Sequence, residues 1–348
     1  MRRLGILLPA VALGLLLTAG PALACGGLIG PNGAVNLLRT STMAGYHDGV
    51  EHYVTAFQFA GGGGAFGSIT PLPDVPSNVE KGGDWTLQRL VLETTPQPAF
   101  EGVFRAAASA DALGAEELMK VRIDALDVTV LRGGAADIGR WAKDHGFRLP
   151  PDAPEVLEFY AARSPIFLAA AFDADAAAER GQQIGDGTSV HVTIPTDNPW
   201  VPLRILALGK TGEERVEADV YLLTDEAPAL LPSPARTPGL RLDHSAAASR
   251  GLLDDLRSDR GMEWIPNEAW LTKVGIDSSA GQLSYDLAID ASGAGAPSRV
   301  DAGFELPGVA VVAASLDAGR LVLAVLFSLV GVAGVWLMTR YRPGDALR

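Results

Sequence analysis

Alternation of apolar and polar residues predicts β-strands over much of this 348-residue chain. Aromatic or β-branched side chains recur at every second residue from Tyr53 to Phe59, and Asp48-Gly49 before them favours a two-residue hairpin turn. The stretch 34–60 is therefore predicted to form two strands around a turn. Further strands are predicted at 66–72, 121–123, 126–131, 166–172, 189–194, 201–208, 216–223, 240–242, 270–276 and 282–289.

Helical spacing of apolar residues marks fewer segments. It runs from Ile138 to His145, where Gly146 is suited to the left-handed stop of a helix. A second helix begins at Asp152, which with Glu155 three residues later forms a capping-box pattern. Other helices are predicted at 85–93 with Asp84 as the cap, at 100–119 and at 246–257.

Strands occur partly in runs and partly between helices, which predicts an α+β fold. We expect a mixed, mainly antiparallel sheet with several short helices, plus one C-terminal transmembrane helix. The transmembrane helix is predicted from the two apolar runs near the ends of the chain.

The N-terminal apolar run has the order of a secretory signal peptide. A basic start precedes the run 4–17, and a small-residue pattern ends at Ala24, so residues 1–24 are predicted to be the signal. Cleavage there makes Cys25 the first mature residue, and Ala24 and Cys25 are the predicted processing residues. An incidental thiol and a lipidated Cys25 both stay open, although Ala22 stands where a lipoprotein signal has leucine.

The C-terminal run, Leu321–Met338, contains no charged residue. At about 1.5 Å of rise per residue, a helix of this length nearly spans the roughly 30 Å hydrocarbon core of a bilayer. Arg340, Arg342 and Arg348 follow it, which places the C-terminus in the cytoplasm. The sequence therefore predicts a single-pass cell-membrane protein with its N-terminal domain outside.

Amino-acid composition predicts boundaries in the part of the chain that lies between these two apolar runs. Four prolines between Pro228 and Gly239 favour a boundary, and 291–302 is rich in Gly, Ala, Ser and Pro, as flexible linkers are. The predicted organisation is a signal peptide at 1–24, a main extracytoplasmic α+β domain at 25–227, a smaller C-terminal subdomain or extension at 228–290, a flexible stalk at 291–319, a transmembrane helix at 320–340 and a cytoplasmic tail at 341–348.

The region between signal and anchor is strongly acidic. Residues 25–319 carry 22 Lys and Arg against 40 Asp and Glu, a formal net charge of −18. No basic patch that could follow a phosphate backbone is expected, so nucleic acid is excluded as a partner. Cys25 is the one cysteine of the sequence, which leaves no intrachain disulfide.

Two motifs that bind phosphates in other proteins are interpreted here as turns. Gly62–Gly67 matches G-x-G-x-x-G, but the residues after it continue as a strand, so the phosphate-binding helix N-terminus is missing. Gly209-Lys210-Thr211 has Arg204 where a P-loop needs its first glycine. It is better explained as a turn between two strands.

Histidines give the one hint of a metal site. If Asp48-Gly49 is a two-residue turn, His47 and His52 point to the same sheet face and Glu51 to the other. No third ligand is near in sequence, so we interpret the pair as exposed polar residues. His191 alternates with valines and is predicted on the solvent face of its strand.

Signatures of common hydrolases are missing, because the sequence has no G-x-S-x-G, H-E-x-x-H or S-x-x-K. We assign no catalytic, cofactor-binding or metal-binding residue and expect no cofactor. Acids brought together only by the fold remain the alternative.

Three segments together resemble a family of exported bacterial proteins. They are Phe66–Pro76, Trp141–Pro150 with the helix that follows it, and Pro202–Ile205, preceded by Ala24-Cys25-Gly26-Gly27. The resemblance is to domain of unknown function 2330 and covers most of residues 25–227. It implies an exported polypeptide, often with a C-terminal hydrophobic tail, and it implies no activity.

Two hypotheses for function follow. The first is a non-enzymatic binding or interaction domain, displayed outside the membrane for a protein or small ligand. The second is a cell-envelope enzyme whose acidic site is formed only in the fold. A cleft with two or more acids of raised pKa favours the enzyme, whereas an acidic surface with one apolar groove favours the binding domain.

Overall fold

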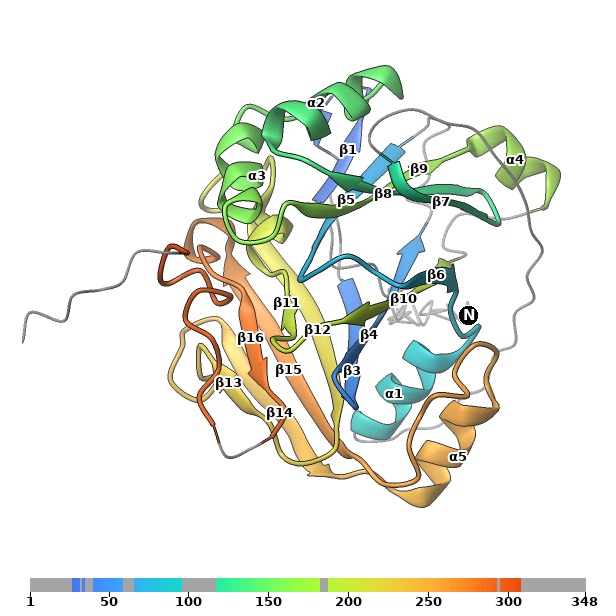
Figure 1. Ribbon diagram of the computed structural model, residues 1–348, viewed down its shortest axis with the longest axis vertical. Helices are drawn as coiled ribbons and strands as arrows, with labels where there is room; N and C mark the ends of the chain where they lie inside the picture. The colour runs from blue at the N-terminus through green and yellow to red at the C-terminus, as the bar shows by residue number, and fades with distance from the viewer. Residues whose placement is uncertain are drawn as a thin grey trace, which may run out of the picture. The chain divides into compact units, whose positions relative to one another are not determined.

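The alternating segments form two large sheets that pack face to face (Figure 1). The computed structural model describes residues 27–31, 33–34, 40–58, 66–95, 117–181, 187–292 and 295–307, all within one unit that ends at Pro307.

The two large sheets, as described, have six and seven strands. The first is antiparallel throughout, in the order β2 (Gly33–Ala34), β1 (Gly27–Gly30), β5 (Phe66–Leu72), β9 (Ile166–Phe172), β8 (Leu126–Arg132) and β7 (Glu117–Ile123). The second has the order β14 (Leu240–Ala247), β15 (Trp270–Ser279), β12 (Arg215–Thr224), β3 (Thr40–His47), β4 (Val50–Gln58), β10 (Gly187–Pro195) and β6 (Asn78–Lys81). In it β12 and β3 run parallel, and the other neighbours are antiparallel.

Smaller elements complete the described part. A short sheet consists of β11 (Trp200–Val201), β16 (Leu287–Asp290) and β13 (Ala229–Leu231). The helices are α1 (Thr86–Thr94), α2 (Ala135–Asp144), α3 (Ala153–Ala161), α4 (Ala174–Glu179) and α5 (Arg250–Ser258), with 3-10 turns η1 (Arg204–Ala207) and η2 (Ala280–Gln282).

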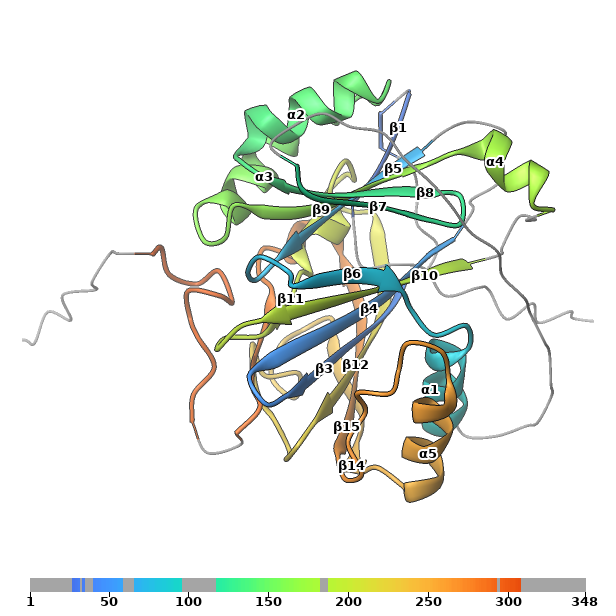
Figure 2. The ribbon, with the colours of Figure 1, turned by 45° about the vertical axis from the view of Figure 1, so that its right-hand side comes forward.

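Helices cover the outer face of each large sheet (Figure 2). α2 and α3 pack on the six-stranded sheet, with Trp141 and Leu157 in one cluster with Phe167. α1 and α5 pack on the seven-stranded sheet, where Leu90 and Val54 share another cluster. Strands that lie between these helices and the opposite sheet are therefore buried on both faces.

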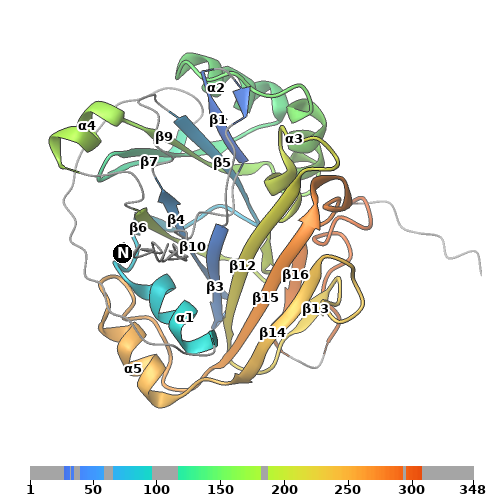
Figure 3. The ribbon, with the colours of Figure 1, turned by 180° about the vertical axis from the view of Figure 1, so that it is seen from behind.

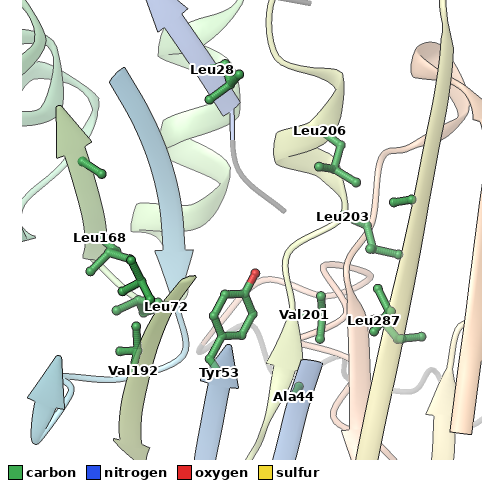
Figure 4. Packing of buried hydrophobic residues seen from close by; sticks show 14 of the residues in the cluster. Leu28, Ala44, Tyr53, Leu72, Leu168, Val192, Val201, Leu203, Leu206 and Leu287 are labelled. Carbon is green, nitrogen blue, oxygen red and sulfur yellow. The ribbon is translucent and has the colours of Figure 1, made fainter. Parts of the chain in front are cut away.

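The main core lies between the two sheets. Figure 4 shows Tyr53 of β4 and Val192 of β10 close to Leu72 of β5 and Leu168 of β9, and all four belong to one buried cluster. Each fully buried aliphatic side chain contributes roughly 1.5–3 kcal/mol to folding. This interface therefore holds the two sheets together.

The predicted fold class is confirmed as far as the described residues go: mixed, mainly antiparallel sheets with short helices. The strand predicted at 201–208 is wrong after Val201. The backbone N–H groups of Leu203 and Arg204 donate to the Asp286 carboxylate at 2.8 and 3.0 Å, and η1 follows in place of a ladder.

The boundaries of the last elements also differ from prediction. β14 continues to Ala247, and the helix expected from Ala246 begins at Arg250, because Ser249 accepts the Leu252 N–H at 3.1 Å and caps it. In the stretch expected as a strand at 282–289, β16 begins only at Leu287.

Two predicted helix caps are wrong, because residues far along the chain bind the groups that the caps would have used. Asp84 does not cap α1, which has Trp85 at its N-cap and no side-chain cap; the Asp259 carboxylate instead accepts the backbone N–H groups of Asp84 and Trp85 just before the helix, both at 3.0 Å, and the Thr86 hydroxyl at 2.8 Å. Asp152 makes no side-chain cap on α3 and accepts the Gly209 N–H at 2.9 Å.

Several predicted features lie outside the described residues. They include the signal peptide with Ala24 and Cys25, most of the helix at 100–119, the transmembrane segment at 320–340 and the tail at 341–348. Residues 117–119 of that helix belong to β7. No helix of the described ranges is long and apolar enough to cross a membrane.

Residues assigned by sequence to the extension and the stalk contribute to the same unit. β14 and β15, from the extension at 228–290, join β12 in the seven-stranded sheet. Within the predicted stalk, the Ala302 carbonyl accepts the Asp286 N–H at 3.1 Å, and Ala302 is fully buried.

Candidate functional site

The hairpin of β3 and β4 brings two histidines to one face of the seven-stranded sheet. Its central residues have positive φ, 50° at Asp48 and 76° at Gly49, as a type I′ turn requires. The register sets Gly45 opposite His52. The predicted turn, and with it the shared face of His47 and His52, is confirmed.

A third histidine comes from β10, the other neighbour of β4. Nδ1 of His52 and Nε2 of His191 are 2.9 Å apart and share a hydrogen bond. Glu80 of β6 lies opposite His191 in the ladder, with a carboxylate oxygen 3.4 Å from Nδ1 of His191. We call Glu80, His191 and His52 the histidine row.

The partners along the histidine row assign its protons. A Glu80 carboxylate can only accept, which favours the tautomer of His191 with its proton on Nδ1, although the 3.4 Å approach does not form a hydrogen bond. In that tautomer Nε2 of His191 accepts from Nδ1–H of His52, which leaves Nε2 of His52 unprotonated. The row can therefore present a neutral base at His52.

Trp264, from the segment after α5, covers this end of the row. Its indole stacks on His52 with ring centroids 3.8 Å apart and planes 3° from parallel. A Cβ on Gly45 would lie 2.3 Å from the indole, so glycine leaves the room that the ring needs. Arg257 fixes the segment by donating to the Ile265 carbonyl at 3.0 Å.

Burial keeps both imidazoles neutral. It lowers the pKa of His52 to about 3, and the charges of His191 and His47 act in the same direction. Burial also lowers the pKa of His191, against the Glu80 carboxylate, which raises it. His191 is 2 % exposed, so its predicted place on the solvent face is wrong: Trp264, whose ring centroid is 6.0 Å away, belongs to a segment that covers this face.

His47 stands apart from the histidine row. Its Nδ1 is 2.6 Å from the Asp225 carboxylate and its Nε2 is 3.4 Å from that of Asp48. Its side chain is 36 % exposed, so it comes closer to the expected exposed polar residue than the half-buried His52 does. Within the described ranges, no group of three His, Cys, Asp or Glu side chains could hold a metal ion.

Glu51, the next residue along β4, points to the opposite face and is fully buried. Neither carboxylate oxygen has a hydrogen-bond partner. Burial raises the pKa of Glu51 to about 8, although the nearby Trp200 N–H acts to lower it. Glu51 is therefore a neutral carboxylic acid at pH 7, enclosed in the protein.

The structure describes one of the two phosphate-binding motifs that the sequence argued against, and only part of the other. Gly209 has a φ of 73° in the turn that precedes β12, as expected, and it donates to Asp152. Of the glycine-rich segment, residues 62–65 lie outside the described ranges, and Phe66 and Gly67 open β5, the predicted strand.

A family model for uncharacterised proteins conserved in bacteria, DUF2330, matches residues 20–229. The match takes in more than half of the chain, including the whole histidine row. The chain belongs to this family. The predicted resemblance is thereby confirmed, and the description of the family gives no activity.

Solved structures similar to this DUF2330 chain come from baculovirus P35. A mutated P35 after caspase cleavage has 8 % identity and a TM-score of 0.38, over 72 % of this chain and 99 % of that one. Baculovirus P35 itself gives 9 % and 0.34, over 73 % and 90 %, and the caspase-8/P35 complex gives 8 % and 0.33, over 72 % and 90 %. At such TM-scores the likeness supports no inference. Comparison with curated proteins finds no match.

A small hollow lies beside β14, on another part of this DUF2330 chain. It holds about 170 Å³ and is lined by Leu230 of β13, Leu242 and Ser245 of β14, Thr272 of β15 and the loop at 233–235. Leu242 is 49 % exposed. The hollow combines an apolar wall with a few hydroxyl groups.

Sequence reasoning found part of the histidine row. The hairpin rule placed His52, but joining it to His191 requires the pairing of β4 with β10, which no local pattern reveals. Trp264 carries no signal that links it to the hairpin. Glu51 could be found, because strand alternation already set it on the face opposite His52.

Proposed function

We propose that this DUF2330 chain is an exported protein, anchored by its C-terminal apolar segment, whose domain binds a protein partner outside the membrane without catalysing a reaction. Export and anchoring rest on the sequence: the signal pattern at 1–24, the run Leu321–Met338 and the arginines that follow it. Binding rests on the surface beside β14.

An exposed sheet edge is the observation that carries the binding proposal. β14 ends the seven-stranded sheet (Figure 3), and an edge strand offers backbone N–H and C=O groups to an extended segment of another chain. The hollow beside it, about 170 Å³, is smaller than the roughly 300 Å³ at which small-molecule sites begin. It fits one apolar side chain of a partner better than a whole metabolite.

The same edge is protected against indiscriminate pairing. Arg241 and Asp243 flank Leu242 and form an ion pair at 3.2 Å, and the register shifts between Leu242 and His244. Charges and bulges are the devices by which edge strands avoid aggregation. A partner must therefore match this edge, which favours a specific protein over chance association.

Buried acids support binding over catalysis, because the fold itself uses them. Asp286 accepts the Tyr160 hydroxyl at 2.8 Å and pairs with Arg163 at 2.5 Å, while Asp259 accepts the Thr86 hydroxyl at 2.8 Å. Glu51 has a raised pKa but is fully buried, so no substrate reaches it. None of these acids gives the enzyme hypothesis the open acidic cleft that it needs.

Thiol labelling in intact cells tests the topology. With Cys25 replaced by serine, one cysteine is introduced either at the exposed Gln88 of α1 or at Ala346 of the tail. In cells with an intact cell membrane and a permeable outer envelope, a membrane-impermeant maleimide is expected to label Gln88→Cys. It is expected to label Ala346→Cys only after the cell membrane is permeabilised. Labelling of both sites before permeabilisation, or of neither, contradicts the proposal.

Photocrosslinking tests the binding surface. A photoreactive residue at Leu242 is expected to give one discrete adduct in cells, and the same residue at Leu92, which is 48 % exposed, is expected to give none with that partner. Leu230→Asp, which places a charge in the wall of the hollow, should abolish the adduct. The same adduct from both positions, or none from Leu242, contradicts a binding site here.

A further inference from the structure

The chain leaves the described domain from a fixed place. Arg163 donates through Nη1 to the Asp301 carbonyl and through Nη2 to the Asp286 carboxylate, both at 2.5 Å. The Arg163 guanidinium also lies 4.0 Å from the Phe159 ring centroid, and Ala302 is fully buried. Residues just before the exit are therefore fastened to the body of the domain.

Apolar side chains gather at this exit. Among the described residues, the large apolar side chains that are exposed are Leu92, Leu242, Phe304 and Leu306, at 48 %, 49 %, 42 % and 64 %. Phe304 and Leu306, which we call the exit patch, lie three and one residues before Pro307. The other two lie on α1 and β14, so the exit holds the one such pair that is close in the chain.

Phe304 of the exit patch is held in position, and an ion pair lies beside it. The Phe304 N–H donates to the Arg299 carbonyl at 2.9 Å, and its ring centroid is 6.1 Å from that of Tyr285. Arg299 pairs with Glu305. A positioned apolar surface beside a neutralised ion pair suits the zwitterionic interface of a bilayer better than a charged ligand.

We propose that the exit patch rests on the lipid surface of the membrane. This inference depends on the anchoring proposed above. Residues 308–320 separate the patch from Leu321, and thirteen residues reach at most about 45 Å. A tether of this length keeps the patch at a high effective concentration near the bilayer, so two apolar side chains suffice for contact.

Fluorescence quenching in vesicles tests this contact with the full chain. In the Cys25→Ser background, an environment-sensitive fluorophore is attached to Leu306→Cys, with Leu92→Cys and Leu242→Cys as matched exposed controls. In phosphatidylcholine vesicles that carry nitroxide lipids, the label at 306 is expected to be quenched several-fold more than either control. Anionic lipid should not increase this quenching, because Arg299 beside the patch is already paired with Glu305.

A second variant keeps the test independent of folding. Phe304→Asn is expected to reduce quenching at position 306, while an unchanged unfolding midpoint shows that the domain is intact. Equal quenching at 306, 92 and 242 overturns the inference. So does a label at 306 that neither aqueous iodide nor nitroxide lipid reaches, since the patch is then covered by residues 308–320 or by a second copy of the chain.

Alkaline carbonate extraction of the same vesicles separates the two proposals. If the chain stays with the lipid but the label at 306 matches the controls, only the exit patch inference fails. If carbonate removes the chain, the anchoring fails and the inference fails with it.

Discussion

Glu51 and His52 are neighbours in β4, yet they face opposite sides of the same sheet and are both held neutral. Burial raises the pKa of Glu51 to about 8 and lowers that of His52 to about 3. The difference lies in their partners: His52 hydrogen bonds to His191 and stacks on Trp264, whereas the Glu51 carboxyl has only the Trp200 N–H near it and no hydrogen bond of good geometry. His52 is therefore positioned by partners on its face of the sheet, whereas Glu51 is only buried on the other face.

This contrast shows that burial and function are separate matters. A carboxyl with a strongly raised pKa is a common mark of an active site. Here it belongs to the fully buried group, while the half-buried His52 is the residue with a built environment. The histidine row is therefore the more organised polar cluster of the two faces of this strand, although its pKa shifts are not the mark of an active site.

Removal of the indole over the row should have the largest effect. Trp264→Ala deletes the ring that stacks on His52 and is expected to lower the free energy of unfolding by about 3 kcal/mol, as large-to-small changes at packed aromatic sites do. Water then reaches His52, so its pKa should rise from about 3 toward 6.5. Denaturant unfolding and imidazole NMR titration measure the two effects.

Leu92→Ala is the control for this change, because Leu92 is 48 % exposed and should be nearly neutral when shortened. A Trp264→Ala protein that loses stability while the pKa of His52 stays near 3 contradicts the covering role of the indole.

Replacement of the buried acid Glu51 should have the next largest effect on stability, and the size of this effect depends on pH. The pKa of Glu51 is about 8 in the folded protein against 4.5 for the free group, so from pH 4.5 to about 8 the unfolded chain releases a proton that the folded chain keeps. Stability therefore falls as pH rises through this window. Glu51→Gln removes this loss and is expected to be more stable than the natural protein at pH 8 by at least about 2 kcal/mol, and by less than about 1 kcal/mol at pH 5.

Unfolding measured at both pH values tests this expectation, with Glu80→Gln as the matched control on the other face. A difference between natural and Glu51→Gln proteins that is the same at pH 5 and pH 8 shows that Glu51 does not titrate as proposed.

The comparison also marks how far sequence reasoning reaches. Local rules placed the β3–β4 hairpin, the helices α2 and α3 and the opposite orientation of Glu51 and His52. They failed where a residue far along the chain supplies the partner: Asp259 binds the N–H groups just before α1, Trp264 covers His52, and Asp286 takes the N–H groups that a strand at 201–208 would have used. Such contacts depend on packing, which spacing along one chain does not encode.

Overpacking under the indole should have a smaller effect. A Cβ on Gly45 lies 2.3 Å from Trp264, so Gly45→Ala must displace the ring and is expected to reduce the free energy of unfolding by about 1–2 kcal/mol. The double mutant with Trp264→Ala gives the decisive measurement. Without the indole the methyl group meets no obstacle, so the two losses should not add. Additive losses mean that the strain lies elsewhere.

Replacement of Glu80, at the far end of the histidine row, should have the smallest effect on stability. Glu80 is 47 % exposed, and the Gly261 backbone also interacts with His191, so Glu80→Gln is expected to change the free energy of unfolding by less than about 1 kcal/mol. The pKa of His191 should fall further, because the carboxylate that raised it is gone. The glutamine oxygen can still accept, so the proton should remain on Nδ1 of His191, which nitrogen-15 NMR of the imidazole reports. A shift of that proton to Nε2 would reverse the direction of the hydrogen bond to His52, and the free base of the row would then no longer be Nε2 of His52.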